Sequence, residues 1–99
     1  NPLLGKAYCY PNPIKGNKGK IRVETNNAQT LNINLYDVSG YFIEKYSKNV
    51  SSNGYFISEW DIDINSLESG VYFANVDVVS NSLSLVKQQS KIIKIAVIK

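Results

Sequence analysis

Apolar and polar residues alternate along most of the chain. Residues 20–25 run Lys-Ile-Arg-Val-Glu-Thr, and the same two-residue period recurs at 31–36, 72–78 and 93–97. This period places one face of a strand against a core and leaves the other face wetter. No segment has the period of a helix over a helical length. The pattern predicts seven strands, at residues 6–10, 19–25, 30–37, 41–47, 54–62, 71–79 and 90–98.

Residues that favour turns separate these strands. Pro11-Asn12-Pro13 ends the first strand, and Gly16-Asn17-Lys18-Gly19 and Ser51-Ser52-Asn53-Gly54 are candidates for turns. Asn26-Asn27-Ala28 and Ser39-Gly40 are typical of hairpin connections. Short strands with regular turns predict an all-β fold, here a seven-stranded antiparallel β-sandwich of the immunoglobulin or fibronectin kind.

Two connecting segments have a distinctive composition. Residues 61–70 contain Asp and Asn cap candidates, and they predict a turn or short 3₁₀ crossover between sheets, with Leu67 plugging the end of the sandwich. Residues 80–90 are polar around Leu83, Leu85 and Val86, and we expect a mobile hairpin loop there. The alternative is that these three residues extend the ladder or contact another protein.

The length and charge of the chain limit the classes of protein to which it can belong. The 99 residues suit one domain, and the chain contains no Met, so we expect a segment of a larger protein in which residues 1–5 are a linker and 6–99 the folded domain. Eleven basic and eight acidic residues give a net charge of +3, spread along the chain. This pattern does not favour nucleic acid as a partner. No apolar run approaches the roughly 18–20 residues of a membrane span, so we expect no stable membrane insertion.

The inventory of reactive side chains is small. Cys9 is the one cysteine and the chain has no histidine, which excludes an internal disulfide, Cys–His and Ser–His nucleophile pairs, and the common zinc sites. We expect Cys9 to be a buried, inert thiol. Glu59, Asp61 and Asp63 alternate on one strand face, but calcium normally needs six to eight oxygens from converging loops. We therefore expect no catalytic residues, no metal and no cofactor.

Four blocks in order carry a family resemblance. They are Tyr10-Pro11-Asn12-Pro13, the segment 35–40 that ends in Asp37-Val38-Ser39-Gly40, Trp60-Asp61, and the segment 67–73 around Gly70, followed by a closing 94–99. The set resembles the type A C-terminal sorting domain of the type IX (Por) secretion system of Bacteroidetes and relatives. The same set also resembles the immunoglobulin-like domain of flagellar hook-capping proteins. The resemblance covers Ala7 to Lys99.

The residues of these blocks also have structural interpretations. Pro11 and Pro13 are expected to stop the first strand and keep its end from pairing with another sheet edge. Asp37 and Gly40 bracket a tight hairpin, Trp60 fills the centre of the core, and Gly70 lets the chain turn before the next strand. The chain departs from the family at Ser58, where a β-branched residue is common, at Tyr41, where a basic residue is favoured, and in a longer last loop.

The resemblance implies a non-catalytic sorting and export domain. Its partners would be the outer-membrane secretion machinery and the upstream domains of a parent protein, which passes through the periplasm and becomes extracellular or attached to the cell surface. A translocon must recognise an exposed surface, and the last strand offers an edge for strand addition. The candidate recognition residues are Lys91, Lys94, Ile95, Val97, Ile98 and Lys99. The alternative interpretation is that these lysines only keep the edge strand soluble and prevent it from pairing with other chains.

Two other functions stay open. The domain can be an accessory immunoglobulin-like module of a multidomain extracellular hydrolase that binds carbohydrate or protein. Its stacking platform would then come from Tyr8, Tyr36, Tyr41, Tyr46 and Tyr55, and a planar patch of three aromatic rings on one face would favour this function. A structural spacer is the third possibility.

Overall fold

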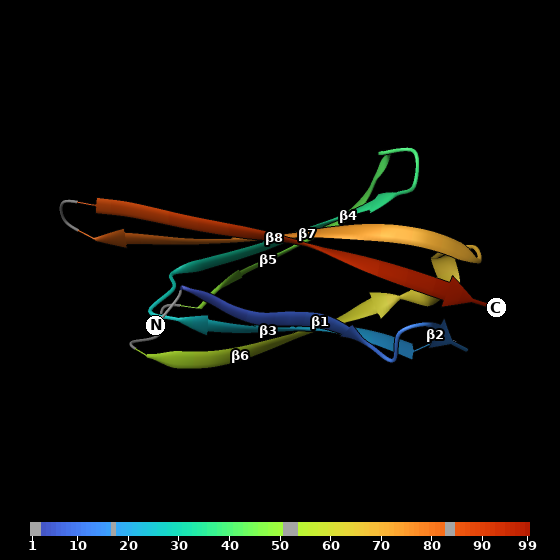
Figure 1. The fold of residues 1–99 in the computed structure, drawn as a ribbon, viewed down its shortest axis with the longest axis horizontal. Coiled ribbons are helices and arrows are strands. Elements are labelled where there is room, and N and C mark those ends of the chain that lie inside the picture. Colours follow the sequence, from blue (N-terminus) through green and yellow to red (C-terminus); the bar gives the residue numbers. More distant parts are fainter. Residues whose placement is uncertain (1–2, 17, 51–53, 83–84) are drawn as a thin grey trace.

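The computed structural model describes residues 3–16, 18–50, 54–82 and 85–99, which form two sheets packed face to face (Figure 1). The first sheet has the order β1-β3-β6 and the second the order β2-β8-β7-β4-β5. The strands are β1 (Leu4–Tyr10), β2 (Ile14–Lys15), β3 (Lys18–Asn26), β4 (Thr30–Asp37), β5 (Phe42–Asn49), β6 (Tyr55–Asp63), β7 (Gly70–Ser82) and β8 (Leu85–Ile98). The all-β sandwich expected from the sequence is confirmed.

Alternate residues of the strands fill the space between the sheets. In β3 the buried positions are Ile21, Val23 and Thr25, and in β8 they are Ile93, Ile95 and Val97. Apolar side chains buried in this way contribute on the order of 25 cal/mol per Å² of surface removed from water. The period-two pattern of the sequence is therefore the pattern of the core.

Each of the seven predicted strands has a counterpart, and β2 is an addition. β2 pairs in parallel with β8, through Ile14 opposite Val97 and Lys15 opposite Ile98, so the sandwich is not wholly antiparallel. Two residues are too few to show a period, which is why the sequence pattern missed this strand. β1 begins at Leu4 and Leu3 is buried, so the folded unit takes in residues expected to form a linker.

The expected loop at 80–90 is wrong. β7 and β8 form one antiparallel ladder that continues without interruption as far as the pair of Ser82 and Leu85. This hairpin projects beyond the body of the sandwich at the left of Figure 1. The alternative, an extended ladder, is correct for Leu85 and Val86, while Leu83 lies outside the described residues. Side chains from Val86 to Ile92 are all exposed, so no buried face marks the strand in the sequence.

Of the two hairpin connections predicted, the one at Ser39-Gly40 is confirmed and the one at residues 26–28 is wrong. Ser39-Gly40 does join a hairpin, β4 to β5, and Asp37 Oδ1 accepts hydrogen bonds from the backbone N–H of Ser39 and Tyr41 at 2.9 Å each. Gly40 has a φ of 91°, which a residue with a side chain rarely adopts. Residues 26–28 do not form a hairpin, because β3 and β4 belong to different sheets.

The turn expected at 16–19 is shorter than predicted. Gly16 has a φ of 88°, but Lys18 and Gly19 already belong to β3, and Asn17 lies outside the described residues. A Cβ at Gly19 would lie 2.4 Å from Cδ1 of Ile14, so this glycine gives Ile14 its place in the core. Of the turn expected at 51–54, the structure describes Gly54, with a φ of 103°.

Trp60 is buried, but it does not occupy the centre of the core. It lies on β6, an edge strand of the first sheet, and its ring stacks on Tyr46 of β5, an edge strand of the second, with centroids 5.5 Å apart. The pair therefore joins the two sheets along one side of the sandwich. Beyond β6 the chain crosses to the second sheet through a 3₁₀ turn at Ile64–Ser66, which confirms the expected crossover. Leu67 is buried there, and Gly70 begins β7.

The molecule is long and narrow. Its principal extents are 46 × 23 × 18 Å and the strands run mainly along the long axis. β8 ends at one end of that axis, and β1 begins in the opposite half of the molecule (Figure 1). In the part of the chain that the structure describes, no helix has the length and apolar character to cross a membrane.

Ser58 provides a test of the core. Its side chain is 2% exposed and its hydroxyl has no hydrogen-bond partner within the described residues. A buried, unpaired hydroxyl destabilises a fold by about 1–3 kcal/mol. We therefore expect Ser58→Val to be more stable than Ser58→Thr by about 1 kcal/mol in urea unfolding, because the two side chains have the same shape and differ in the hydroxyl. Equal stabilities would show that the hydroxyl has a partner.

Candidate functional site: the edge of the last strand

The last strand, β8, lies next to the edge of the second sheet. One side of β8 pairs with β7 along its whole length. The other side meets β2 at Val97 and Ile98 only. β8 is therefore covered at its C-terminal end and open towards the hairpin tip, and these two parts have different chemistry.

The side chain of Asn12 extends the covered part. Its Nδ2 donates a hydrogen bond to the carbonyl of Lys94 at 3.0 Å, and its Oδ1 accepts one from the N–H of Ala96 at 3.1 Å. The amide thus takes the place that a peptide group of a neighbouring strand would have. Pro11 and Pro13 flank Asn12. β1 ends at Tyr10, just before Pro11, as expected, and β2, which pairs directly with β8, begins after Pro13.

The chain end is tied to the same region. The N–H of Lys99 donates to Ser69 Oγ at 2.8 Å, and its Nζ donates to the carbonyl of Asn65 at 3.4 Å. Gly70 pairs with Val97 at the start of β7. The hydroxyl of Tyr72 donates to the carbonyl of Glu68 at 2.6 Å and steadies the same connection.

The six predicted recognition residues divide into two groups. Ile95 and Val97 are 1% and 2% exposed and face the core, so their side chains do not reach a partner of the folded domain. Lys91, Lys94, Ile98 and Lys99 are exposed. Of the six predicted residues, only this exposed group is therefore accessible to a partner.

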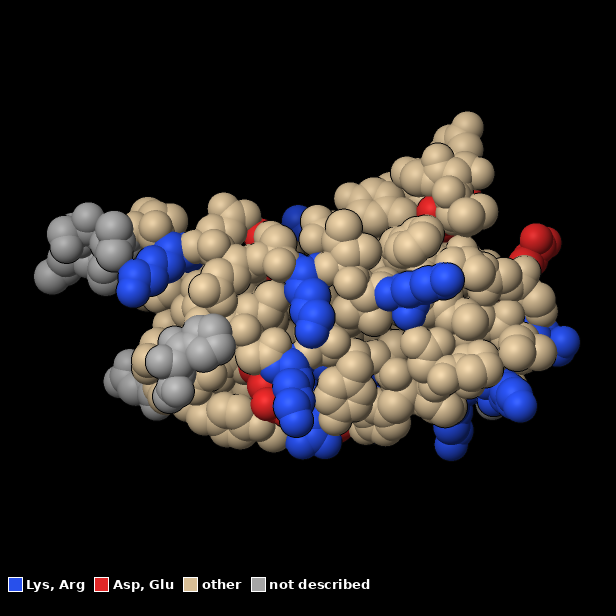
Figure 2. Space-filling view, in the orientation of Figure 1, with Lys and Arg blue, Asp and Glu red and all other residues tan. Residues whose placement is uncertain are grey.

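Charges are segregated between the strands. None of the acidic residues lies on β1, β2 or β8. The exposed lysines on these three strands and at the chain end are Lys6, Lys15, Lys87, Lys91, Lys94 and Lys99. Figure 2 shows basic side chains along the length of this view and few acidic ones among them. Along the sequence these charges are spread, because β1 and β2 lie near the start of the chain and β8 near its end, and they come together only in the fold.

The predicted tyrosine platform is divided among three places. Tyr8 and Tyr55 lie with Tyr10 on the outer face of the first sheet, where the rings of Tyr8 and Tyr10 are 5.9 Å apart and tilted by 41°. Tyr46 stacks on Trp60 between the sheets. Tyr36 meets Phe42 edge-on, and exposed Tyr41 lies beside them at the β4–β5 turn. The five tyrosines therefore form no single stacking surface.

Polar contacts fix two tyrosines of the outer face. The hydroxyl of Tyr10 donates to Glu59 Oε2 at 2.6 Å, which raises the pKa of Tyr10 and lowers the pKa of Glu59. Partial burial raises the pKa of Tyr55, and a hydrogen bond to Glu24 acts in the same direction. These carboxylates act as partners of phenols. Within the described residues no three acidic or cysteine side chains come close enough to hold a metal ion.

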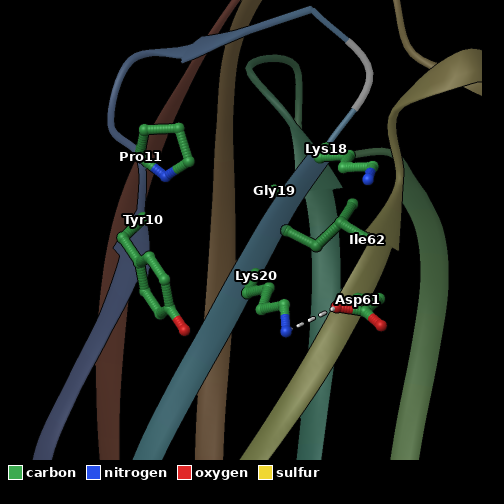
Figure 3. A pocket seen from close by; sticks show the side chains of 7 residues that line it. All are labelled: Tyr10, Pro11, Lys18, Gly19, Lys20, Asp61 and Ile62. Atoms are coloured by element: carbon green, nitrogen blue, oxygen red, sulfur yellow. Dashed lines mark ion pairs between the residues drawn. The ribbon is translucent and has the colours of Figure 1, made fainter.

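An open pocket of about 520 Å³ lies where β1, β3 and β6 end. Its lining residues, all drawn in Figure 3, are Tyr10, Pro11, Lys18, Gly19, Lys20, Asp61 and Ile62. Lys20 Nζ lies 3.7 Å from Asp61 Oδ1, so one of the two lysine charges is already paired. Among the described residues Lys18 has no ion-pair partner, so its ammonium group is available in the pocket beside the ring of Tyr10.

The sequence profile of the secretion system C-terminal sorting domain family matches residues 8–95. The chain belongs to this family. No curated protein matches the chain, and no solved structure matches it either. Membership makes this sorting domain a C-terminal signal for type IX secretion, carried by a secreted or cell-surface protein. The matched range begins at Tyr8, within β1, and ends at Ile95, within β8.

The role of Asn12 in the sorting domain predicts a local effect. Asn12→Ala removes both hydrogen bonds to β8, and we expect the free energy of unfolding to fall by about 1 kcal/mol. The amide of Ala96 should lose protection in hydrogen exchange, since its acceptor is Asn12 Oδ1. Asn12→Asp is the matched control, because it keeps an acceptor for Ala96 but loses the donor to Lys94. Unchanged protection of Ala96 in Asn12→Ala would contradict this role.

The buried thiol predicts a dependence on pH. Burial raises the pKa of Cys9 from 9.0 to about 11. Between these values the folded chain keeps a proton that the unfolded chain releases, so stability is fully present below about pH 9 and declines as pH rises towards 11. We expect this decline, measured by urea unfolding, to be shallower in Cys9→Ala than in the wild type. Parallel declines would show that Cys9 does not titrate in this way.

Proposed function

We propose that this domain is a non-catalytic export module which directs a larger protein through the outer-membrane type IX translocon. The observation that carries the proposal is the family match over residues 8–95. The parent protein passes through the periplasm and ends outside the cell or on its surface, joined to the domain ahead of β1. The recognised surface comprises Lys91, Lys94, Ile98 and Lys99, and nucleic acid and the membrane interior are not partners.

Electrostatics supports this choice of surface. A receptor recognises a folded domain through its exposed groups. The side chains of Lys91, Lys94, Ile98 and Lys99 lie together on β8 and directly after it, and β8 carries no acidic residue. Charge complementarity speeds the encounter of a protein with its partner and suppresses wrong partners. The covered end of β8 holds Lys94, Ile98 and Lys99 in place. The carbonyl of Lys94 and the N–H groups of Ala96 and Lys99 are hydrogen-bonded to side chains, and Ile98 pairs with Lys15.

We also propose that the sandwich is immunoglobulin/fibronectin-like. The strand order supports this, with β1, β3 and β6 in the positions of strands A, B and E of such domains. β8, β7, β4 and β5 then correspond to G, F, C and C′, and β2 is a short second part of strand A that moves to the other sheet. The exposed tyrosines of the first sheet keep an accessory binding module as the second candidate function.

Charge substitution tests the export function. Removing residues 91–99 would also remove Ile93, Ile95 and Val97 from the core, so a truncation does not separate folding from recognition. We instead expect Lys91→Gln/Lys94→Gln/Lys99→Gln, fused behind a periplasmic signal peptide and a fluorescent protein, to remain in the periplasm of a host with a type IX system. The wild-type fusion should reach the cell surface, and fluorescence of cell fractions measures both.

The matched control is Lys18→Gln/Lys45→Gln/Lys48→Gln, which removes the same charge from strands β3 and β5. We expect this variant to be exported like the wild type. If the wild-type fusion stays in the periplasm as a folded protein, the export function is wrong and carbohydrate or protein binding by the tyrosine face becomes the function to test. If both triple variants are exported equally, the domain sorts through another surface.

A further inference from the structure

The open part of β8, residues 86–92, has backbone groups that point away from the sandwich. Asn12 binds the carbonyl of Lys94 and the N–H of Ala96, so the even-numbered residues of β8 direct these groups to the side opposite β7. The register with β7 shows no irregularity along the strand. Because the side alternates from residue to residue, Val86, Gln88, Ser90 and Ile92 also point their N–H and carbonyl groups outwards.

These outward groups have no partner within the described residues. β2 ends its pairing at Val97 and Ile98, and the amide of Asn12 reaches no further than Lys94. The side chains of Gln88 and Ser90 both donate to Asp77 Oδ1 at 2.7 Å, which holds this part of the hairpin in shape without covering its edge. A row of unpaired backbone donors and acceptors on a stiff hairpin is a template for another strand.

The two faces beside this edge differ in character. On the outer face the exposed apolar side chains are Val86 and Ile92, at 67% and 69% exposure. The inner face carries Lys87, Gln89 and Lys91, and the Gln89 side chain accepts a hydrogen bond from the N–H of Leu4 on β1 at 2.7 Å. An added strand would thus place alternate side chains against apolar and against positively charged neighbours.

We propose that residues 86–92 of β8 bind an extended acidic segment of the secretion machinery as an added strand of the second sheet. The choice of partner rests on the export function proposed above. Backbone hydrogen bonds to the four even-numbered residues supply a contact that any extended chain can make. Lys87 and Lys91 supply the preference for acidic side chains on the inner face, and Val86 and Ile92 the preference for apolar ones on the outer face.

A second copy of the chain fits this edge less well. In an antiparallel pair of two β8 strands centred on Gln89, each Lys87 would lie directly opposite Lys91 of the other copy. Like charges directly opposite one another destabilise a strand pair. Shifting the pair by one register places Leu85 or Ile93 opposite a lysine, so neither neighbouring register gives a complementary face. Charge therefore favours an acidic partner over self-association.

A peptide titration on the 99-residue chain tests the proposal. The probe is a fluorescently labelled peptide of about nine residues in which valine and aspartate alternate. We expect saturable binding in fluorescence anisotropy, with amide shifts in NMR confined to β8 and its neighbours β7 and β1. A peptide with lysine in place of aspartate should bind at least about tenfold more weakly. No binding of the aspartate peptide, or equal binding of both, would overturn the proposal.

Gln88→Pro separates backbone pairing from general charge attraction. The N–H of Gln88 points away from β7, so proline removes an outward donor and blocks the edge without removing a ladder hydrogen bond. We expect about a tenfold loss of affinity for the aspartate peptide in Gln88→Pro, and a change of less than about twofold in Gln88→Ala, which also loses the contact with Asp77. Equal affinities of the two variants would show that no strand is added.

Charge reversal and export complete the test. Lys87→Glu/Lys91→Glu should bind the peptide about tenfold more weakly, whereas Lys45→Glu/Lys48→Glu on β5 should not. Sedimentation of the free chain as a dimer that Gln88→Pro converts to monomer would assign the edge to self-association instead. In cells, export of a folded Gln88→Pro fusion at the wild-type level would overturn the use of this edge in secretion while leaving the export function itself intact.

Discussion

The backbone of a sheet's edge needs hydrogen-bond partners, and in this domain that requirement governs the path of the chain around β8. The first strand lies in one sheet, yet the next few residues must reach the other sheet to cover Lys94, Ala96 and Val97. Asn12 and Ile14 make this crossing possible. The side-chain amide of Asn12 takes the place of a peptide group, and the side chain of Ile14 enters the core over Gly19. The beginning and the end of the domain are thereby joined.

Local periodicity was sufficient for the strands that bury one face. Ile21, Val23 and Thr25 alternate with charged residues because one side of β3 is core and the other is solvent, and the sequence records that difference directly. The sequence shows no such alternation at β2, which is two residues long. It shows none from Val86 to Ile92 either, where the side chains on both faces are exposed. From Val86 to Ile92 the strand is maintained by the backbone ladder and by polar contacts such as those of Gln88 and Ser90 with Asp77. Backbone pairing leaves little trace in the side-chain pattern.

The candidate site was predictable as a strand but not as a surface. The alternation that identified residues 90–98 also implied that Ile95 and Val97 share the buried face with Ile93, and only the lysines and Ile98 remain outside. Asn12 is 82 residues from Lys94 in sequence, so no local sequence motif could predict their contact. The basic side of the sandwich likewise arises from β1 and β2 near the start of the chain and from β8 near its end, which come together only once the sheets have formed.

The placement of the chain ends has a mechanical consequence. A parent protein attached ahead of β1 would pull on the domain in the half of its 46 Å axis that lies opposite Lys99, and the strands run mainly along this axis. Ladder hydrogen bonds in antiparallel pairs are perpendicular to the strands. A force applied along the axis therefore shears the bonds of β1 with β3, and of β8 with β7, all at once rather than opening them in succession. Tension between the start of β1 and the end of β8 would therefore meet the resistance of two whole ladders.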